Sequence, residues 1–193
     1  LNDLLQRVVT DFAPVAREKN LRFTVMPTSV HVRSDPNLLR RLIQNLVSNA
    51  IKYTREGRVL VGVRRRGDKA VIQVIDTGIG IPTTKFRTVF REFARLEEGA
   101  RTASGLGLGL SIVDRIARVL KHSVDIASQS GKGTEFRVEL PIETNIARIK
   151  AQPKRTGADA ANTNLKGLRV LCIDNEPKIL EGMTLLLSGW GCA

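Results

Sequence analysis

The sequence predicts an α+β fold, a two-layer α/β sandwich in which helices cover one face of a mixed, mostly antiparallel sheet. Helical and strand-like segments follow one another without the strict βαβ alternation of a parallel sheet, and Gly67-Asp68 lies between two apolar segments as the turn of a hairpin. Hydrophobic residues make up 42% of the 193 residues and aromatic residues only 4%, so aliphatic side chains must build the core.

The first part of the chain predicts two helices separated by two short strands. Apolar residues recur at helical spacing over residues 2–19. Residues 21–26 and 30–32 have the composition of short strands. Ser34-Asp35-Pro36 is a helix start, because a capping side chain precedes Pro in the first turn, and the second helix should end near Tyr53.

The following part predicts more strands and one further long helix. Its elements are, in order, strands over 59–63 and 70–75, a loop over 76–82, a short helix over 86–96, a polar loop over 97–104, a helix from Gly107 to Lys121, and strands over 124–127 and 134–140. These elements complete the unit that begins at residue 1.

Composition divides the chain into three parts. Residues 1–142 hold the elements above, residues 143–166 have no apolar period and predict a linker, and residues 168–193 resemble the opening of a separate α/β domain. There, residues 168–173 predict a buried type of strand and residues 178–187 a helix. One strand and one helix cannot bury an apolar face, so we expect 168–193 to be disordered or packed on a neighbour. The sequence at both ends looks cut, so we expect the chain to be a piece of a longer protein.

Composition also limits the classes of function. The formal charge of +12 is compatible with a nucleic-acid partner, but the positive residues are scattered, and the densest cluster, Arg64-Arg65-Arg66, precedes a hairpin tip. We therefore expect no nucleic-acid partner. Cys172 and Cys192 form no metal-binding pattern and indicate reduced intracellular thiols. No apolar stretch approaches the roughly 20 residues that span a bilayer, so we expect a cytoplasmic chain, with any membrane anchor in a missing region.

The predicted second helix carries an unusual polar stripe. Asn45, Asn49 and Lys52 are spaced i, i+4 and i+7 and share one face, which Arg41 extends by one turn. Asn is a poor residue for a helix interior, so two on one face need a reason. Amide oxygens can bind Mg²⁺ and Lys can meet a phosphate. The alternative is a plain solvated helix face.

Two glycine-containing motifs follow. Asp76-x-Gly78-x-Gly80 comes directly after a strand, where a carboxylate can accept a hydrogen bond from an exocyclic amine; a simple turn or half a calcium loop would look similar. The segment 105–111 (Gly-Leu-Gly-Leu-Gly-Leu-Ser) leads into an apolar helix, and free N–H groups at a helix start form a phosphate site. A flexible hinge is the alternative. Neither motif has the spacing of a P-loop or a Rossmann fingerprint.

The order of the motifs is more specific than any one of them. The Asn stripe, Asp76-x-Gly78-x-Gly80, Phe90-x-x-Phe93, the Gly-rich segment and Gly131-x-Gly133-Thr134 resemble the N, G1, F, G2 and G3 boxes of histidine kinases. These kinases share a superfamily with gyrase, the 90-kDa heat-shock chaperone and MutL. The resemblance covers about residues 1–142 and implies a Bergerat-type ATP-binding fold with ATP and Mg²⁺ as ligands.

The resemblance also implies roles for individual residues. Asn49 would coordinate Mg²⁺ with support from Asn45, Lys52 would contact phosphate, and Tyr53 would border the nucleotide. The implied catalytic set is Asn45, Asn49 and Lys52, and the implied ATP-binding set is Asn49, Lys52, Tyr53, Asp76, Gly78, Gly80, Ile81, Gly105, Leu106, Gly107, Leu108, Gly109 and Thr134. Asp76 would recognise the adenine amine, and residues 96–106 would form a lid over ATP.

Asn45 separates two possible reactions. Hydrolytic members of the superfamily carry Glu here as a general base, and an amide cannot take a proton from water. Phosphotransfer to an external acceptor is therefore favoured over ATP hydrolysis. A hydrolytic ATPase, a nucleotide-binding module without activity and a basic nucleic-acid binder stay as alternatives.

The acceptor implied by the resemblance lies outside this chain. Neither His31 nor His122 is in an acceptor-like context, so the partner would be an upstream dimerisation domain that carries the His. The tail resembles the start of a response-regulator receiver domain, in which Asp174 and Glu176 would begin a second, incomplete Mg²⁺ site. Asn175 departs from the more usual Asp. A downstream receiver domain or response regulator is the second implied partner, as in a hybrid sensor kinase.

Overall fold

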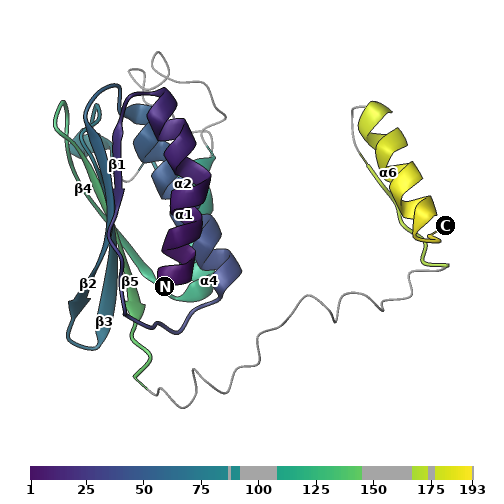
Figure 1. The fold of residues 1–193 in the computed structure, drawn as a ribbon, viewed down its shortest axis with the longest axis horizontal. Helices are drawn as coiled ribbons and strands as arrows, with labels where there is room; N and C mark the ends of the chain where they lie inside the picture. The colour runs from purple at the N-terminus through teal and green to yellow at the C-terminus, as the bar shows by residue number, and fades with distance from the viewer. Residues whose placement is uncertain (87, 92–107, 145–166, 174–176, 193) are drawn as a thin grey trace. The chain divides into compact units, whose positions relative to one another are not determined.

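The computed structural model describes residues 1–86, 88–91, 108–144, 167–173 and 177–192 (Figure 1). These residues belong to two compact units, Leu1–Thr144 and Asn145–Ala193. The first unit contains the sheet, the three long helices and every motif discussed above except those of the tail. The second unit contains one described helix, α6 (Pro177–Gly189).

A five-stranded sheet forms one layer of the first unit. Its strands are β1 (Arg22–Val25), β2 (Arg58–Arg66), β3 (Lys69–Asp76), β4 (Ser123–Gln129) and β5 (Gly133–Pro141), in the spatial order β1-β2-β3-β5-β4. The β1–β2 pair is parallel, and the other three pairs are antiparallel. The predicted mixed, mostly antiparallel sheet is confirmed.

Three helices form the second layer on one face of the sheet (Figure 1). They are α1 (Asn2–Glu18), α2 (Pro36–Tyr53) and α4 (Gly109–Leu120). Asp35 caps α2, because its Oδ1 accepts hydrogen bonds from the N–H groups of Asn37 (2.9 Å) and Leu38 (2.8 Å). The core between the layers is aliphatic apart from Phe136, as the composition predicted; fully buried members include Leu5, Leu42, Ile43, Leu46, Val59, Val61, Ile72 and Val138.

The other face of the sheet carries charged and polar residues among apolar ones such as Leu60, Val71 and Ile75. Because successive side chains of a strand point to opposite faces, the residues next to the buried ones in β2, β3 and β5 share this open face. Lys69 pairs with Glu139 at 3.0 Å across β3 and β5, and Arg137 pairs with Glu135 at 2.6 Å along β5. The Arg64-Arg65-Arg66 cluster is exposed at the end of β2, as predicted.

The end of β5 is fastened to the segment before α2. Val32 and Ile142 form an isolated antiparallel bridge, and the N–H of Glu143 donates to the carbonyl of His31 at 2.9 Å. Arg33 adds an ion pair to Glu143, with Nη2 2.9 Å from Oε2. We call residues 31–33 and 141–143 the clasp.

Two predicted elements are wrong, and a third lies only partly within the described residues. Residues 30–32 form no strand; only Val32 pairs, because its partner is the single residue Ile142 past the end of β5. Before the predicted helix over 86–96, a 3-10 helix occupies Thr83–Lys85, and residues 86 and 88–91 form turns and a bend, whereas most of that helix falls outside the described residues. Residues 168–173 form no strand, and Leu171 and Ile173 are 84% and 87% exposed, because no neighbouring strand among the described residues pairs with them.

Candidate functional site

The polar stripe of α2 faces the first residue of α4. The Nδ2 of Asn45 donates to the carbonyl of Arg41 at 2.8 Å, one turn earlier, which leaves its Oδ1 directed toward α4. A Cβ placed on Gly109 would lie 3.3 Å from Nδ2 and 3.4 Å from Oδ1 of Asn49, and 3.5 Å from Oδ1 of Asn45. The fold therefore brings the Asn motif and the Gly-rich motif into contact.

The start of α4 lies beside these amides and has no side-chain cap. Leu108 is the N-cap residue and makes no side-chain capping hydrogen bond, and Ser111 instead turns its Oγ to the carbonyl of Leu108 at 2.8 Å. The first N–H groups of a helix lack partners within the helix and carry partial positive charge. Leu108 and Gly109 are placed here, whereas Gly105, Leu106 and Gly107 lie outside the described residues.

Asp76 is a buried carboxylate at the end of β3. Its side chain is on the helix-covered face, the residue is only 8% exposed, and Oδ1 accepts hydrogen bonds from the N–H groups of Gly78 (2.8 Å) and Thr134 (3.2 Å). Burial raises the pKa of Asp76 from 3.8 to about 6, although both backbone hydrogen bonds favour the charged form. At neutral pH this carboxylate is charged and can accept hydrogen bonds, and its burial in the charged form costs free energy.

The loop after β3 is held by the end of α2. The N–H of Ile79 donates to the carbonyl of Tyr53 at 3.2 Å. A Cβ on Gly78 would lie 2.5 Å from the same carbonyl oxygen and 2.9 Å from Oδ1 of Asp76. Glycine at position 78 is thus a requirement of close packing between the loop, Tyr53 and the buried carboxylate.

The same loop is anchored on its other side by the β4–β5 turn. Gly80 has a φ of +69°, and a Cβ there would collide with the carbonyl of Gln129. The N–H of Ile81 donates to Oγ of Ser128 at 2.8 Å. Ser128 in turn donates to the carbonyl of Gly133 at 2.8 Å and lies 2.9 Å from Oγ1 of Thr134.

Ser128 is a site residue that the sequence analysis missed. It lies in the segment treated only as a connection between strands, and its partner Ile81 is 47 positions away in the sequence. The Gly131-x-Gly133-Thr134 motif was the available signal, but it does not indicate which side chain links the two loops. Ser128 ties the loop carrying Ile81 to the strand carrying Thr134.

Lys52 and Tyr53 form the end of α2 beside this loop. The Nζ of Lys52 lies 5.2 Å from the centre of the Tyr53 ring, a cation–π distance. Lys19, at the end of α1, donates from Nζ to the carbonyls of Ile51 (2.9 Å) and Lys52 (3.1 Å). A cation at the C-terminal end of a helix stabilises it, so Lys19 positions the turn that carries both residues. Lys19 was not identified from the sequence.

The remaining candidates fall into two groups. Phe90 packs edge-on against Phe136, with ring centres 6.4 Å apart, and His122 is half-buried with Nε2 2.8 Å from Oγ of Ser34. Both side chains therefore have structural contacts. Phe93, Asp174 and Glu176 lie outside the described residues, as does most of the predicted lid. No group of three or more His, Cys, Asp or Glu residues that suits a metal occurs in the described part.

Most of the first unit matches a known protein family. The profile of the histidine kinase-, DNA gyrase B-, and HSP90-like ATPases matches residues 34–144, more than half of the chain. The chain belongs to this family. As a member of this ATPase family of the histidine kinase type, it shares its α+β sandwich with solved catalytic domains of histidine kinases.

The relatives and structural neighbours that the chain resembles include sensor histidine kinases. The sensor histidine kinase AtsR of Burkholderia thailandensis is 30% identical over 97% of this chain and 32% of its own length. The circadian input-output histidine kinase CikA of Synechococcus elongatus is 38% identical over 82% of this chain and 20% of its own length. The crystal structure of full-length ShkA in complex with AMPPNP superposes with a TM-score of 0.66 at 25% identity, covering 99% of this chain and 38% of ShkA.

The catalytic domain of histidine kinase ThkA gives a TM-score of 0.62 at 25% identity and covers 72% of this chain and 92% of its own. The match thus covers nearly the whole length of the isolated ThkA catalytic domain. The chain spans only about a fifth to a third of the length of CikA and AtsR. Among the described helices, none is long and apolar enough to span a membrane.

Proposed function

We propose that this chain is the ATP-binding catalytic domain of a hybrid sensor histidine kinase and transfers the γ-phosphate of ATP to a His on an upstream dimerisation domain. The observation that carries the proposal is the convergence of three motifs, which come from distant parts of the sequence. Asp76 lies at the sheet end of the site, and Asn49 faces Gly109 at the start of α4. One end suits a base and the other a polyphosphate.

Asp76 supports recognition of adenine. Its Oδ1 already accepts two backbone hydrogen bonds, so the loop and β5 hold the carboxylate in one orientation. The other oxygen can accept a hydrogen bond from the exocyclic amine of the base. Gly78 and Gly80 bring the backbone close without side chains, and Ile81 and Thr134 are held on either side of the same network by Ser128. These contacts would fix the base.

The start of α4 and the amides of α2 support binding of phosphates. The N–H groups at the start of α4 attract anions, and the Asn49 amide is half-buried, with no hydrogen-bond donor to its oxygen in the described part of the chain. Magnesium binds oxygen ligands and keeps several waters and phosphate oxygens, so a single Asn oxygen is a sufficient protein ligand here. When bound, Mg²⁺ would neutralise charge on the phosphates.

Asn45 supports transfer to another group over hydrolysis. Its Nδ2 is engaged with Arg41, and its Oδ1 faces the start of α4, where a general base would have to stand. An amide oxygen can orient a water but cannot accept its proton. Lys52, now over the Tyr53 ring, would reach the phosphates from the next turn of the same stripe.

The remaining parts of the proposal concern the whole protein. His122 is engaged with Ser34 and His31 is exposed in the segment of the clasp that precedes α2, so the acceptor His would be on an upstream dimerisation domain. Residues 1–142 would be the catalytic domain, 143–166 a linker and 168–193 the start of a receiver domain, in which Asp174 and Glu176 would hold Mg²⁺. An ATP-dependent reaction of this kind takes place in the cytoplasm.

The deciding experiment is phosphotransfer from labelled ATP to a supplied dimerisation domain that carries the acceptor His. We expect Mg²⁺-dependent labelling of that domain, loss of labelling with Asn49→Ala, and little change with Ser48→Ala, which alters the exposed neighbour on α2. Rapid phosphate release without any acceptor would instead identify a hydrolytic ATPase. Absence of ATP binding by calorimetry would refute both enzymatic functions.

A further inference from the structure

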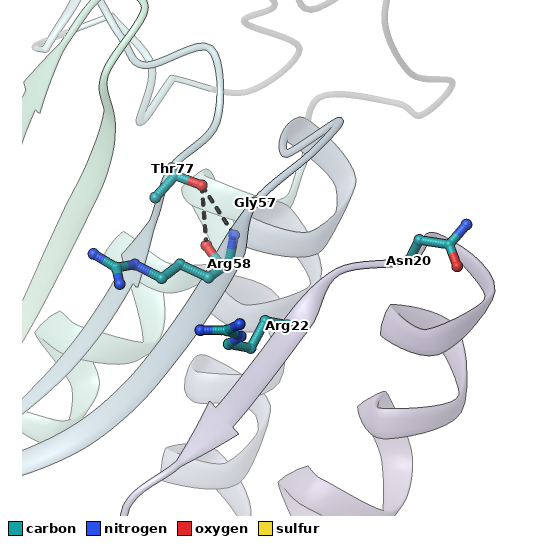
Figure 2. Close-up of a pocket in the computed structure, with 5 residues that line it drawn as sticks. All are labelled: Asn20, Arg22, Gly57, Arg58 and Thr77. Carbon is teal, nitrogen blue, oxygen red and sulfur yellow. Dashed lines mark hydrogen bonds between the residues drawn. The ribbon is translucent and has the colours of Figure 1, made fainter.

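An open cavity of about 480 Å³ lies at the sheet end near β1, apart from the nucleotide site. It is lined by Asn20, Arg22, Gly57, Arg58 and Thr77 (Figure 2). None of the proposed ATP ligands lines it, and Thr77, which follows Asp76, is its nearest link to them along the chain. Pockets of this size commonly hold small ligands.

Two arginines dominate the cavity. Arg22 of β1 and Arg58 of β2 are direct partners in the parallel register, and Figure 2 shows their side chains extending in the same direction from the two strands. Adjacent strands lie about 5 Å apart, so two positive charges are held side by side. Like charges directly opposite each other destabilise a sheet. The fold therefore keeps two like charges, Arg22 and Arg58, next to each other in the cavity.

Several other cations of this unit are neutralised by carboxylates. Lys69 and Arg137 on the same sheet each pair with a glutamate, and Arg118 pairs with Asp114 on α4. Within the described part of the chain, the guanidinium groups of Arg22 and Arg58 have no carboxylate partner, and no acidic side chain lines their cavity. An anion from solution would supply the missing partner.

The cavity wall is built from ordered backbone. Thr77 Oγ1 accepts a hydrogen bond from the N–H of Arg58 at 3.0 Å, and the N–H of Arg22 donates to the carbonyl of Gly57 at 3.0 Å. Gly57 has a φ of +112°, and a Cβ there would collide with the Thr77 hydroxyl. These contacts fix the two strand starts relative to each other, so both arginines are presented from a rigid frame.

We propose that the Arg22–Arg58 cavity binds the phosphate group of a small ligand, at a site separate from the ATP phosphates. Two guanidinium groups can offer paired N–H donors to the oxygens of one phosphate. Asn20 and Thr77 complete the lining, with the Thr77 hydroxyl engaged with the backbone of Arg58. A dianion would relieve the repulsion between the two strands, so binding should stabilise the domain.

The test uses the 193-residue chain, labelled with ¹⁵N and saturated with Mg²⁺ and AMPPNP to fill the nucleotide site. Inorganic phosphate and glycerol 3-phosphate are titrated at constant ionic strength, with acetate and chloride as comparison anions. We expect saturable shifts of the Arg22, Gly57, Arg58 and Thr77 amide signals by both phosphates, with a dissociation constant on the order of 1 mM. Phosphate should also raise the melting temperature.

The control variants separate this site from general charge effects. Arg22→Gln/Arg58→Gln should weaken phosphate binding at least about tenfold and abolish the phosphate-induced rise in melting temperature. Arg64→Gln, which removes a charge from β2 outside the cavity, should change neither. If the double variant does not fold, Arg58→Lys replaces it in the test, because this variant keeps the charge. Arg58→Lys should bind phosphate more weakly than the wild type because the paired donors of the guanidinium are lost.

Three results would overturn the proposal. Shifts that acetate or chloride reproduces at equal ionic strength would show unspecific screening. Binding of equal strength in the double variant would place the anion elsewhere. A response to inorganic phosphate but none to glycerol 3-phosphate would exclude a phosphorylated small ligand and leave the free ion as the occupant.

Discussion

Gly109 at the first position of α4 lies against the side chain of Asn49 on α2, with only 3.3 Å between a Cβ placed at Gly109 and Nδ2 of Asn49. Because Gly109 has no side chain, two motifs that are about sixty residues apart in the sequence can come into contact. The lack of a Cβ at position 109 leaves the Asn49 amide free to set its own orientation toward a ligand.

We expect Gly109→Ala to weaken Mg²⁺-dependent ATP binding about tenfold without loss of stability. The added methyl group would displace the amide of Asn49 by a few tenths of an ångström, and small displacements of ligand-positioning groups are costly. Alanine favours helix, so α4 itself should gain slightly. Calorimetric titration and thermal melting measure the two effects, and unchanged ATP affinity would contradict the proposed role of Asn49.

Asp76→Asn should stabilise the protein at neutral pH while it weakens nucleotide binding. The folded-state pKa of Asp76 is raised from 3.8 to about 6, so the native state holds a proton that the unfolded chain has already released. Relative to Asn, the wild-type chain should therefore lose stability as the pH rises from about 4 to about 6, by up to about 3 kcal/mol. Below about pH 4 the two proteins should be equally stable.

Denaturant unfolding across this pH range measures the difference between the two proteins. Asn can still accept both backbone hydrogen bonds through its oxygen, so the network with Gly78 and Thr134 should survive. A stability difference that does not depend on pH would mean that the carboxylate is not held against its preference for water.

Gly133 and Gly131 offer a matched pair of substitutions in one turn. Gly133 has a φ of +110°, and a Cβ there would collide with the carbonyl of Asp76, whereas Gly131, with a φ of +77°, has open space around it. We expect Gly131→Ala to cost about 1 kcal/mol in unfolding free energy through backbone strain alone. Gly133→Ala should cost about 2 to 4 kcal/mol more. Equal effects, measured by urea unfolding, would argue against close contact between β5 and Asp76.

Lys19→Met should weaken ATP binding through α2, because it removes the amine that binds the carbonyls of Ile51 and Lys52. The loss of unfolding free energy should be modest, about 1 kcal/mol, since the amine is close to solvent. Lys19→Arg should restore much of the ATP affinity, whereas Lys132→Met, which changes an exposed lysine on the β4–β5 turn, should have no effect. An affinity unaffected by Lys19→Met would limit this residue to a role in stability.

Elements with strong local signals were predicted well. The cap at Asp35 and the apolar stripe of α2 mark that helix, and Gly67-Asp68 marks the β2–β3 hairpin. The sequence also indicated the motifs around Asn49, Asp76 and Gly109, because each has a residue type that is unusual for its position. Their role in ATP binding stays a prediction.

Features that depend on distant partners were not predicted. Val32 has the composition of a strand but finds a single partner at Ile142, and residues 168–173 have that composition with no strand beside them. Ser128 and Lys19 act on residues that are 47 and 32 positions away, respectively. Apolar composition specifies a preference for burial, whereas pairing depends on which backbone groups the tertiary fold brings within reach.

The clasp between residues 31–33 and 141–143 has a mechanical consequence. Any tension on the chain beyond Thr144 enters the domain at Glu143, where the ion pair to Arg33 and the backbone bond to His31 carry it first. These contacts are loaded before the antiparallel ladder of β3 and β5, which ends at Asp76 and Thr134. A force applied by a neighbouring part of the chain would therefore break the contacts of the clasp first, at one end of the sheet. The buried carboxylate of Asp76, at the other end, would be disturbed only afterwards.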